Sequence, residues 1–131
     1  MRQKNRTITV ENQVFVWNYT EKYERLKDAF ISRLFFSPQD RKSVVVECFF
    51  KTSPHFLGCH LNWGFWAVKD GIECEINFNQ PGFISVFIGF VLANKVDFAR
   101  QERYRFDNAA DFLEEMGYHS FKSMAEFYPA T

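Results

Sequence analysis

Cysteine is scarce and unpaired in this sequence. The three cysteines, Cys48, Cys59 and Cys74, are odd in number and include no Cys-x-x-Cys spacing. Disulfide-stapled secreted domains and zinc knuckles depend on paired cysteines at short, regular spacings. We therefore interpret the three side chains as reduced thiols, and we expect no metal site and no cofactor.

An excess of charge of either sign is also missing. Lysine plus arginine and aspartate plus glutamate number 16 each, so the formal net charge is zero. A general nucleic-acid binder normally relies on a strong positive field. We therefore expect no general nucleic-acid binding, although a local basic patch remains compatible with this balance.

Hydrophobic runs long enough for a bilayer are absent as well. The most apolar segment predicts a helix from about Pro81 to Ala93, whose rise of ~1.5 Å per residue gives a length of only about 20 Å. The hydrocarbon core of a bilayer is ~30 Å thick. Met1 to Arg6 also lack the order of charges and apolar residues that marks a secretory signal. We expect a cytoplasmic protein that does not bind membranes.

Aromatic residues, in contrast, are abundant. Phenylalanine (17 residues), tyrosine (five) and tryptophan (three) make up 19% of the chain. Such rings bury much area at little rotamer cost, and they concentrate in cores, pockets and interfaces. No repeat, linker or low-complexity segment divides the 131 residues, so we expect a single domain over 1–131 with one core.

The helix predicted from about Pro81 to Ala93 is expected to organise the fold. Asn79 is a good N-cap, and Pro81 suits the first turn because its missing N–H costs nothing there. Large rings share one face of this helix, at Phe83, Phe87 and Phe90. Small residues fill much of the remainder, at Gly82, Ser85, Gly89 and Ala93. A helix that is apolar all round must be covered on nearly all sides, so this one belongs to a core or an interface.

Alternating apolar residues predict several strands. These cover Thr7–Val10, Val14–Tyr19, Ser43–Thr52, Phe65–Val68, Ile72–Phe78 and a segment near Arg103–Phe106. The first two form an opening hairpin, and Asp70-Gly71 supplies the positive φ of a second hairpin. In the strand over Ser43–Thr52 one face is expected to point to the core, namely Val44, Val46, Cys48 and Phe50.

Helical spacing predicts three further helices. Tyr23, Leu26, Phe30 and Leu34 favour a helix from about Thr20 to Ser32, although Ile31–Phe36 also fits a strand that turns at Ser37–Asp40. Asn108 and Asp111 are expected to cap a helix that ends at Gly117 and carries Ala109, Phe112, Leu113 and Met116. A last short helix is predicted over about Ser120 to Tyr128. Together these elements predict an α+β domain, with an antiparallel-rich sheet of four to six strands and helices packed on it.

The order of these elements resembles a group of known proteins. Ile8-x-Val10 to Phe15-x-Trp17, then the hairpin ending Gly71-Ile72-x-x-x-Ile76, then Pro81-Gly82 opening an apolar helix, resemble small uncharacterised bacterial α+β proteins. Proteins of this kind are carried on mobile gene cassettes such as those of integrons. The resemblance spans Ile8–Ala93 and implies a compact bacterial protein, and it says nothing about catalytic residues.

Candidate catalytic and metal-binding residues gather in the irregular segment 53–64. His55, Cys59 and His60, with Cys74, are the residue types of a soft-metal site, but their spacing matches no common zinc pattern. Cys59 as a nucleophile with His55 or His119 as its base is a second hypothesis, which depends on geometry in space. The competing interpretation is buried thiols and loop histidines.

Two sets of charged residues likewise have two interpretations each. Glu47, Glu73 and Glu75 form an acid–base pair only if their strands are neighbours, and the simpler interpretation is a solvated sheet face. Arginines interleaved with an aromatic ring, at Arg100, Arg103, Tyr104 and Arg105, suit single-stranded nucleic acid. Acidic neighbours at Asp97, Glu102 and Asp107 favour local ion pairs instead.

The aromatic residues carry the functional prediction. Candidate ligand or interface residues are Trp17, Trp63, Phe65, Trp66, Phe83, Phe87 and Phe90, with Phe15, Val45 and Phe49 as further apolar surplus. One core of this size does not easily enclose them all, and soluble monomers rarely expose large apolar patches. We therefore expect a non-enzymatic binding module, most simply a homodimer. The alternatives are a module that binds an apolar small molecule, or a small hydrolase or transferase that uses the 53–66 loop.

Overall fold

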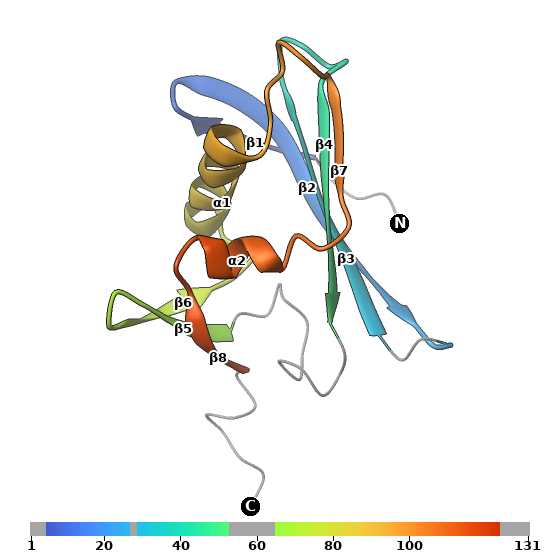
Figure 1. Cartoon of the computed structure of the whole chain (residues 1–131). Helices are drawn as coiled ribbons and strands as arrows, with labels where there is room; N and C mark the ends of the chain where they lie inside the picture. Colours follow the sequence, from blue (N-terminus) through green and yellow to red (C-terminus); the bar gives the residue numbers. More distant parts are fainter. Residues whose placement is uncertain (1–4, 27–28, 53–64, 124–131) are drawn as a thin grey trace, which may run out of the picture.

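In the part of the chain that the structure describes, two sheets and two helices make up the fold, and Figure 1 shows their arrangement. The computed structural model describes residues 5–26, 29–52 and 65–123. In chain order the elements are β1 (Arg6–Val10), β2 (Gln13–Glu24), β3 (Ala29–Pro38), β4 (Val45–Thr52), β5 (Phe65–Lys69), β6 (Ile72–Ile76), α1 (Pro81–Asn94), β7 (Arg103–Phe106), α2 (Asp111–Glu115) and β8 (His119–Ser123). The α+β prediction is confirmed.

The larger sheet has five strands in the order β1-β2-β3-β4-β7, and the smaller has three in the order β6-β5-β8. The β4–β7 pair is parallel and the other pairs are antiparallel. The strand number of the larger sheet agrees with the prediction. The hairpin of β5 and β6, however, forms a separate small sheet with β8. Both helices and the small sheet lie on one side of the five-stranded sheet (Figure 1).

The two predicted hairpins are confirmed at their turns. Glu11 and Asn12 join β1 to β2 with φ angles of 51° and 67°. Asp70 and Gly71 join β5 to β6 with φ angles of 54° and 75°. Positive φ at both central residues is the two-residue turn whose twist matches that of the flanking strands.

The helix predicted over Thr20–Ser32 is wrong. β2 continues to Glu24 and pairs with β3 from Ala29 onward, which confirms the alternative strand over Ile31–Phe36. In β3, Ser32, Leu34 and Phe36 are at most 1% exposed, so the burial follows a period of two. Cross-strand pairing on both sides of β3 outweighs the coincidental helical spacing, because strand preference depends on such neighbours.

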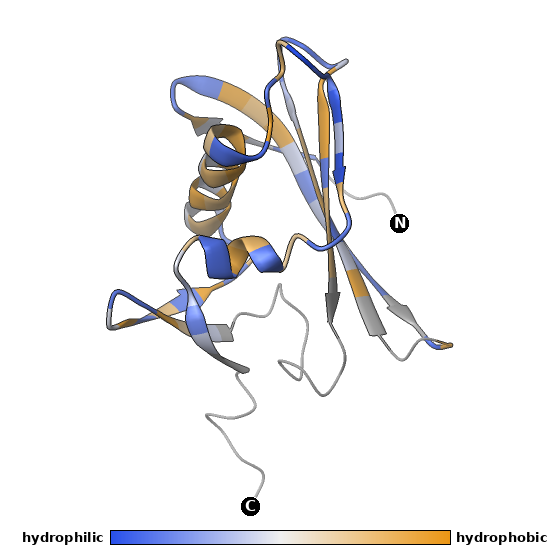
Figure 2. Cartoon of the chain, in the orientation of Figure 1, coloured by the Kyte–Doolittle hydropathy of each residue, from blue (hydrophilic) through white to orange (hydrophobic). Residues whose placement is uncertain are grey.

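The core lies between the five-stranded sheet and α1. The predicted core face of β4 is confirmed, because Val44, Val46, Cys48 and Phe50 are all 0% exposed. Phe78 links sheet to helix, since its ring centroid lies 4.7 Å from that of Phe50 and 5.7 Å from that of Phe87. Figure 2 shows α1 as an almost wholly apolar ribbon facing this sheet. Within the described residues, neither helix combines the length and apolar character needed to cross a membrane.

The predicted span of α1 is confirmed, but its predicted cap is wrong. Gln80 occupies the N-cap position and makes no side-chain cap. Asn79 instead donates its backbone N–H to Asn77 Oδ1 at 2.8 Å, as part of the turn before the helix. A Cβ on Gly89 would lie 3.8 Å from Val10 Cγ1, so this glycine marks where α1 approaches β1. At least one of the small residues of α1, Gly89, therefore allows close packing within the chain.

The C-terminal elements agree with the prediction only in part. The four predicted residues are all buried, Phe112 and Leu113 within α2 and Ala109 and Met116 beside it. No side chain caps α2, and Asn108 contributes only its backbone carbonyl to Asp111 N–H. The helix predicted over Ser120–Tyr128 is wrong at its start, where β8 pairs with β5. Positive φ values of 102° at Gly117 and 55° at Ser120 interrupt any helix there. The remainder of that prediction lies outside the described residues.

Candidate functional site

Most of the predicted interface aromatics belong to the core of one chain. Trp17 is 1% exposed and Phe87 is 0% exposed. Phe83 and Phe90 are partly buried and contact other rings, with Phe83 5.1 Å from Phe78 and Phe90 6.2 Å from Phe112. The core therefore encloses more of the aromatic supply than the sequence argument allowed.

The remaining predicted site residues divide between β5 and the segment before it. Trp66 is half-buried on β5, opposite Glu75 of β6, and Phe65 begins the same strand. The residues predicted for catalysis, His55, Cys59 and His60, lie outside the described residues, as does Trp63.

The described thiols occupy two different environments. Burial raises the pKa of Cys48 from 9.0 to about 12, so this thiol stays protonated at neutral pH. Cys74 lies on β6 and donates its S–H to the Ile72 carbonyl at 3.3 Å. Within the part of the chain that the structure describes, no three histidine, cysteine or acidic side chains group as metal ligands.

The candidate carboxylates are not brought together. Glu47 lies on β4 of the larger sheet, whereas Glu73 and Glu75 lie on β6 of the smaller one. Glu47 Oε2 accepts a hydrogen bond from Arg33 Nε at 2.6 Å, and Glu73 and Glu75 are exposed. This arrangement agrees with a solvated sheet face and does not form a carboxylate pair.

The predicted local ion pairing around β7 is confirmed at Arg105 among the described residues, whereas Glu102 pairs with Arg41 and not with a neighbouring arginine of this segment. Arg105 Nε lies 2.9 Å from Asp107 Oδ1, and this hydrogen bond raises the pKa of Arg105. Glu102 Oε2 accepts from Arg41 Nη2 at 3.2 Å and from Ser43 Oγ at 3.0 Å. These contacts fasten β7 to the neighbouring loop.

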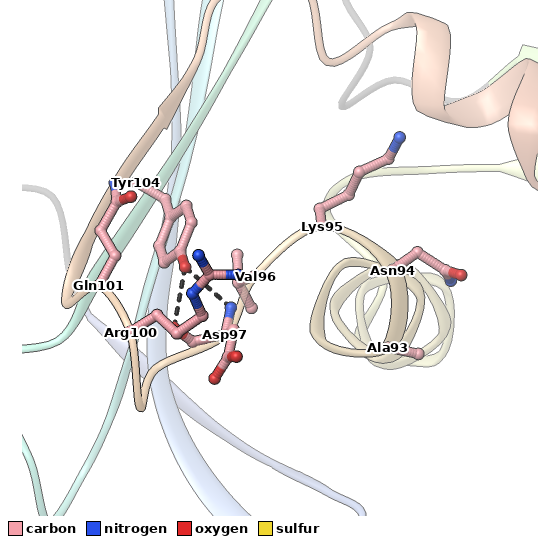
Figure 3. Close-up of a pocket in the computed structure, with 8 residues that line it drawn as sticks. All are labelled: Ala93, Asn94, Lys95, Val96, Asp97, Arg100, Gln101 and Tyr104. Carbon is pink, nitrogen blue, oxygen red and sulfur yellow. Dashed lines mark hydrogen bonds between the residues drawn. The ribbon is translucent and has the colours of Figure 1, made fainter.

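A polar hollow of about 460 Å³ lies between the end of α1 and β7 (Figure 3). The Tyr104 hydroxyl donates to the Asp97 carbonyl at 2.9 Å and accepts from the Asp97 N–H at 2.8 Å. Asp97 Oδ1 accepts from the Ala99 N–H at 3.1 Å, and Lys95 Nζ pairs with Glu115 at 2.6 Å. These groups therefore hold the turn between α1 and β7, which is a structural role.

A second candidate site is the side of the five-stranded sheet that faces away from α1. Strand alternation places Val16 of β2, Arg33 and Phe35 of β3, Glu47 and Phe49 of β4, and Arg105 of β7 on this side. We call this surface the open face, because no described helix or strand lies over it (Figure 1).

Two phenylalanine rings on the open face are each covered by an arginine. Arg33 Cζ lies 5.1 Å from the ring centroid of Phe35, and Arg105 Cζ lies 4.4 Å from that of Phe49. Both distances fall within the ~6 Å range of cation–π contacts. Arg33 also bonds Glu47, and the Arg33 and Glu47 side chains are still 33% and 30% exposed. The result is a flat array of rings and planar cations on neighbouring strands.

Charge is unevenly distributed over this neutral molecule. Alternation adds Lys22 and Arg103 to the two arginines of the open face, where Glu47 bonds Arg33 and Asp107, just after β7, pairs with Arg105. The small sheet and α2 instead carry exposed acidic residues, at Asp70, Glu73, Glu75, Asp111, Glu114 and Glu115. The zero net charge therefore combines a basic sheet face with an acidic end.

A hollow of about 420 Å³ adjoins the open face near the start of β1. Val16 and Phe35 contribute apolar lining, and Thr7, Ser37 and Lys42 contribute polar groups. This combination offers an apolar surface beside a cation and hydroxyl groups.

Sequence reasoning missed the centre of this surface. Arg33 and Phe35 follow the helix predicted over Thr20–Ser32 and belong to the alternative strand over Ile31–Phe36, and the local pattern does not show that this strand pairs with Glu47 and Phe49 of β4. The signal that would have revealed them is the alternation of Ser32, Leu34 and Phe36 with Arg33 and Phe35, which gives β3 an inner and an outer face.

Comparison with known proteins adds no assignment. The chain matches no protein-family model, and it shows no significant similarity to a curated protein or to a solved structure. The resemblance to cassette-borne bacterial proteins therefore stays a prediction, and function is argued from the geometry alone.

Proposed function

We propose that this protein is a non-enzymatic binding module whose working surface is the open face of the five-stranded sheet. The observation that carries the proposal is the pair of rings, Phe35 and Phe49, each covered by an arginine on a face without a described element over it.

The composition of the open face supports this proposal. Interface cores are enriched in aromatic residues and arginine, because these side chains combine large contact area with oriented hydrogen-bond donors. Val45, Phe35 and Phe49 are half-buried and Val14 is 37% exposed, so apolar area on this face still meets solvent. A partner that covers this area gains roughly 25 cal/mol per Å² of apolar surface.

The competing interpretation is a sheet face that only meets solvent. Arginine stems commonly lie along apolar surface while the charged group stays hydrated, and exposed ion pairs contribute little stability. The two interpretations differ in one respect. Only a working surface loses a partner when its rings are replaced while the fold is kept.

Self-association is the second candidate, in line with the homodimer that the sequence favours. The observation in its favour is Val86, which is 51% exposed on the outer side of α1, near the open space beside Gly82. A stable twofold dimer buries about 1,600 Å² in total. A dimer through α1 predicts a species of twice 15.6 kDa in sedimentation velocity, which Val86→Glu dissociates. A monomer at about 50 µM would exclude it.

Two further sequence hypotheses have narrower support. For an apolar small molecule, the support is the lining of the hollow by Val16 and Phe35. A hydrolase or transferase that uses the 53–66 loop depends on residues that are mostly outside the described part of the chain.

Affinity purification with matched variants tests the open face. The tagged chain is recovered from bacterial cells beside a Phe35→Ser and Phe49→Ser double variant and an Ile72→Ser control, which replaces an exposed apolar residue of the small sheet. We expect a macromolecule, protein or nucleic acid, that co-purifies with the native chain and the control and falls at least about tenfold with the double variant, which corresponds to about 1.4 kcal/mol. Circular dichroism checks that both variants keep the fold. Equal recovery with folded variants would show that the open face is not the working surface.

A further inference from the structure

We propose, resting on the proposed function, that the partner of the open face is a single-stranded nucleic acid. The inference comes from three properties that occur together on this face: two half-buried rings that each contact a guanidinium group, an excess of cations, and a hollow with an apolar lining beside a cation.

The phenylalanine rings and arginine guanidinium groups offer surfaces on which bases stack. Unpaired bases stack on aromatic rings and on arginine guanidinium planes, and this stacking tolerates any base because every base has a π-face. Phe35 with Arg33 and Phe49 with Arg105 form two such stacks on adjacent strands. Arg33 lies directly opposite Phe49 in the β3–β4 register, so the two stacks are neighbours on one surface.

The cations supply contacts to the phosphates. Lys22, Arg33, Arg103 and Arg105 share the open face, where Glu47 pairs with Arg33 and Asp107 pairs with Arg105. Lys22 and Arg103 therefore make up the cation excess, and Lys42 lines the adjoining hollow. Arg103 is exposed, and no ion pair is recorded for its side chain among the described residues. The field of this face therefore attracts anions, although the whole chain is neutral.

The same observations disfavour the other occupants. A twofold contact between two open faces would place their cation excess in opposition, which costs free energy. A duplex hides the faces of its bases, so it uses the cations and not the rings. An acidic protein segment matches the charge but has no need of two ring–guanidinium stacks. A single-stranded nucleic acid uses both the cations, through its phosphates, and the ring–guanidinium pairs, through its bases.

The test measures fluorescence polarisation of a labelled 12-nucleotide single strand of mixed sequence, as DNA and as RNA, at several salt concentrations. We expect a dissociation constant of about 1 to 100 µM near 0.1 M salt, and a slope of log affinity against log salt of roughly −2 to −3, because about four cations meet phosphates. A duplex of the same length should bind at least about fivefold more weakly.

Variants separate stacking from charge. Phe35→Leu with Phe49→Leu keeps apolar volume but removes the rings, and it should weaken binding at least about fivefold, with the salt slope unchanged. Arg103→Glu with Arg105→Glu should weaken binding and reduce the slope by about 1 to 1.5. Arg100→Glu is the matched control, because it reverses one charge in the hollow of Figure 3, away from the open face, and should change affinity less than about twofold.

Three outcomes would overturn the inference. These are no binding at 200 µM protein, tighter binding of the duplex, and binding that the leucine variant leaves unchanged. Competition by poly-glutamate with an unchanged leucine variant would identify an acidic protein segment as the partner. That result would refute the nucleic-acid proposal while the binding-module proposal stands, since the affinity purification tests the latter separately.

Discussion

At the scale of single residues, burial sets the chemistry of Cys48. Its side chain is 0% exposed, and burial raises its pKa to about 12 from 9.0. The unfolded chain therefore loses this proton more readily than the folded chain. The stability that the group contributes is complete below pH 9 and is lost as the pH rises from about 9 towards about 12, at about 1.4 kcal/mol per pH unit.

This linkage gives a testable difference between two proteins. Between pH 8 and pH 10.5, the free energy of unfolding of the native chain should fall about 2 kcal/mol further than that of Cys48→Ala. Urea denaturation at both pH values measures the difference, and the variant controls for the other groups that titrate in this range. Parallel losses in both proteins would contradict the assigned environment of Cys48.

Ser37 is a second residue with a definite energetic role. It is 4% exposed, and its hydroxyl donates to the Val44 carbonyl at 2.5 Å across the turn between β3 and β4. Ser37→Ala should lower the free energy of unfolding by about 1 to 2 kcal/mol, because a buried acceptor loses its donor. Ser43→Ala is the matched control. Its hydroxyl bonds Glu102 at an exposed site, so a loss below about 0.5 kcal/mol is expected. Equal losses would refute the distinction.

At the scale of elements, two glycines predict opposite effects of the same substitution. Gly82 lies in the first turn of α1, where an added Cβ would meet nothing within 4 Å, so Gly82→Ala should stabilise the chain by about 0.5 kcal/mol. Gly117 ends the α2 segment with a φ of 102°, so Gly117→Ala should destabilise it by at least about 1 kcal/mol. Thermal unfolding measures both changes, and shifts of the same sign would contradict the assigned backbone conformations.

Local signals were sufficient to predict many of the elements. Asp70-Gly71 specified a hairpin because positive φ is intrinsic to that turn, and the Phe50 face of β4 followed from strict alternation. Pro81 likewise marked the start of α1. In each case the residues that decide the structure are adjacent in the sequence.

The failures have a common physical cause, which is pairing between distant segments. β3 is a strand because β2 and β4 pair with both of its edges, and β8 is a strand because β5 offers it a free edge. The spacing of apolar residues around Leu34 does not indicate which distant segments pair with this strand. The open face depends on the same pairings, so its Arg33–Glu47 and Arg105–Phe49 contacts were beyond prediction from local pattern.

At the scale of the whole molecule, the fold segregates its functions between two sides of one sheet. The inner side, with Trp17, Phe50 and α1, supplies the core. The other side is left to Phe35, Phe49 and the cations, while exposed acidic residues gather on the small sheet and α2. This segregation reconciles a neutral composition with a locally basic binding surface.

The most direct test of the open face as a surface for single-stranded nucleic acid is an NMR titration of the ¹⁵N-labelled chain, whose 15.6 kDa suits the method, with the 12-nucleotide single strand. The shifted backbone amides should cluster on β2, β3, β4 and β7 around Phe35 and Phe49, and residues 93–101 of the Figure 3 hollow and the small sheet should stay unchanged. Shifts confined to the hollow from Ala93 to Gln101 or to β5 and β6, or no shifts at all, would contradict the account.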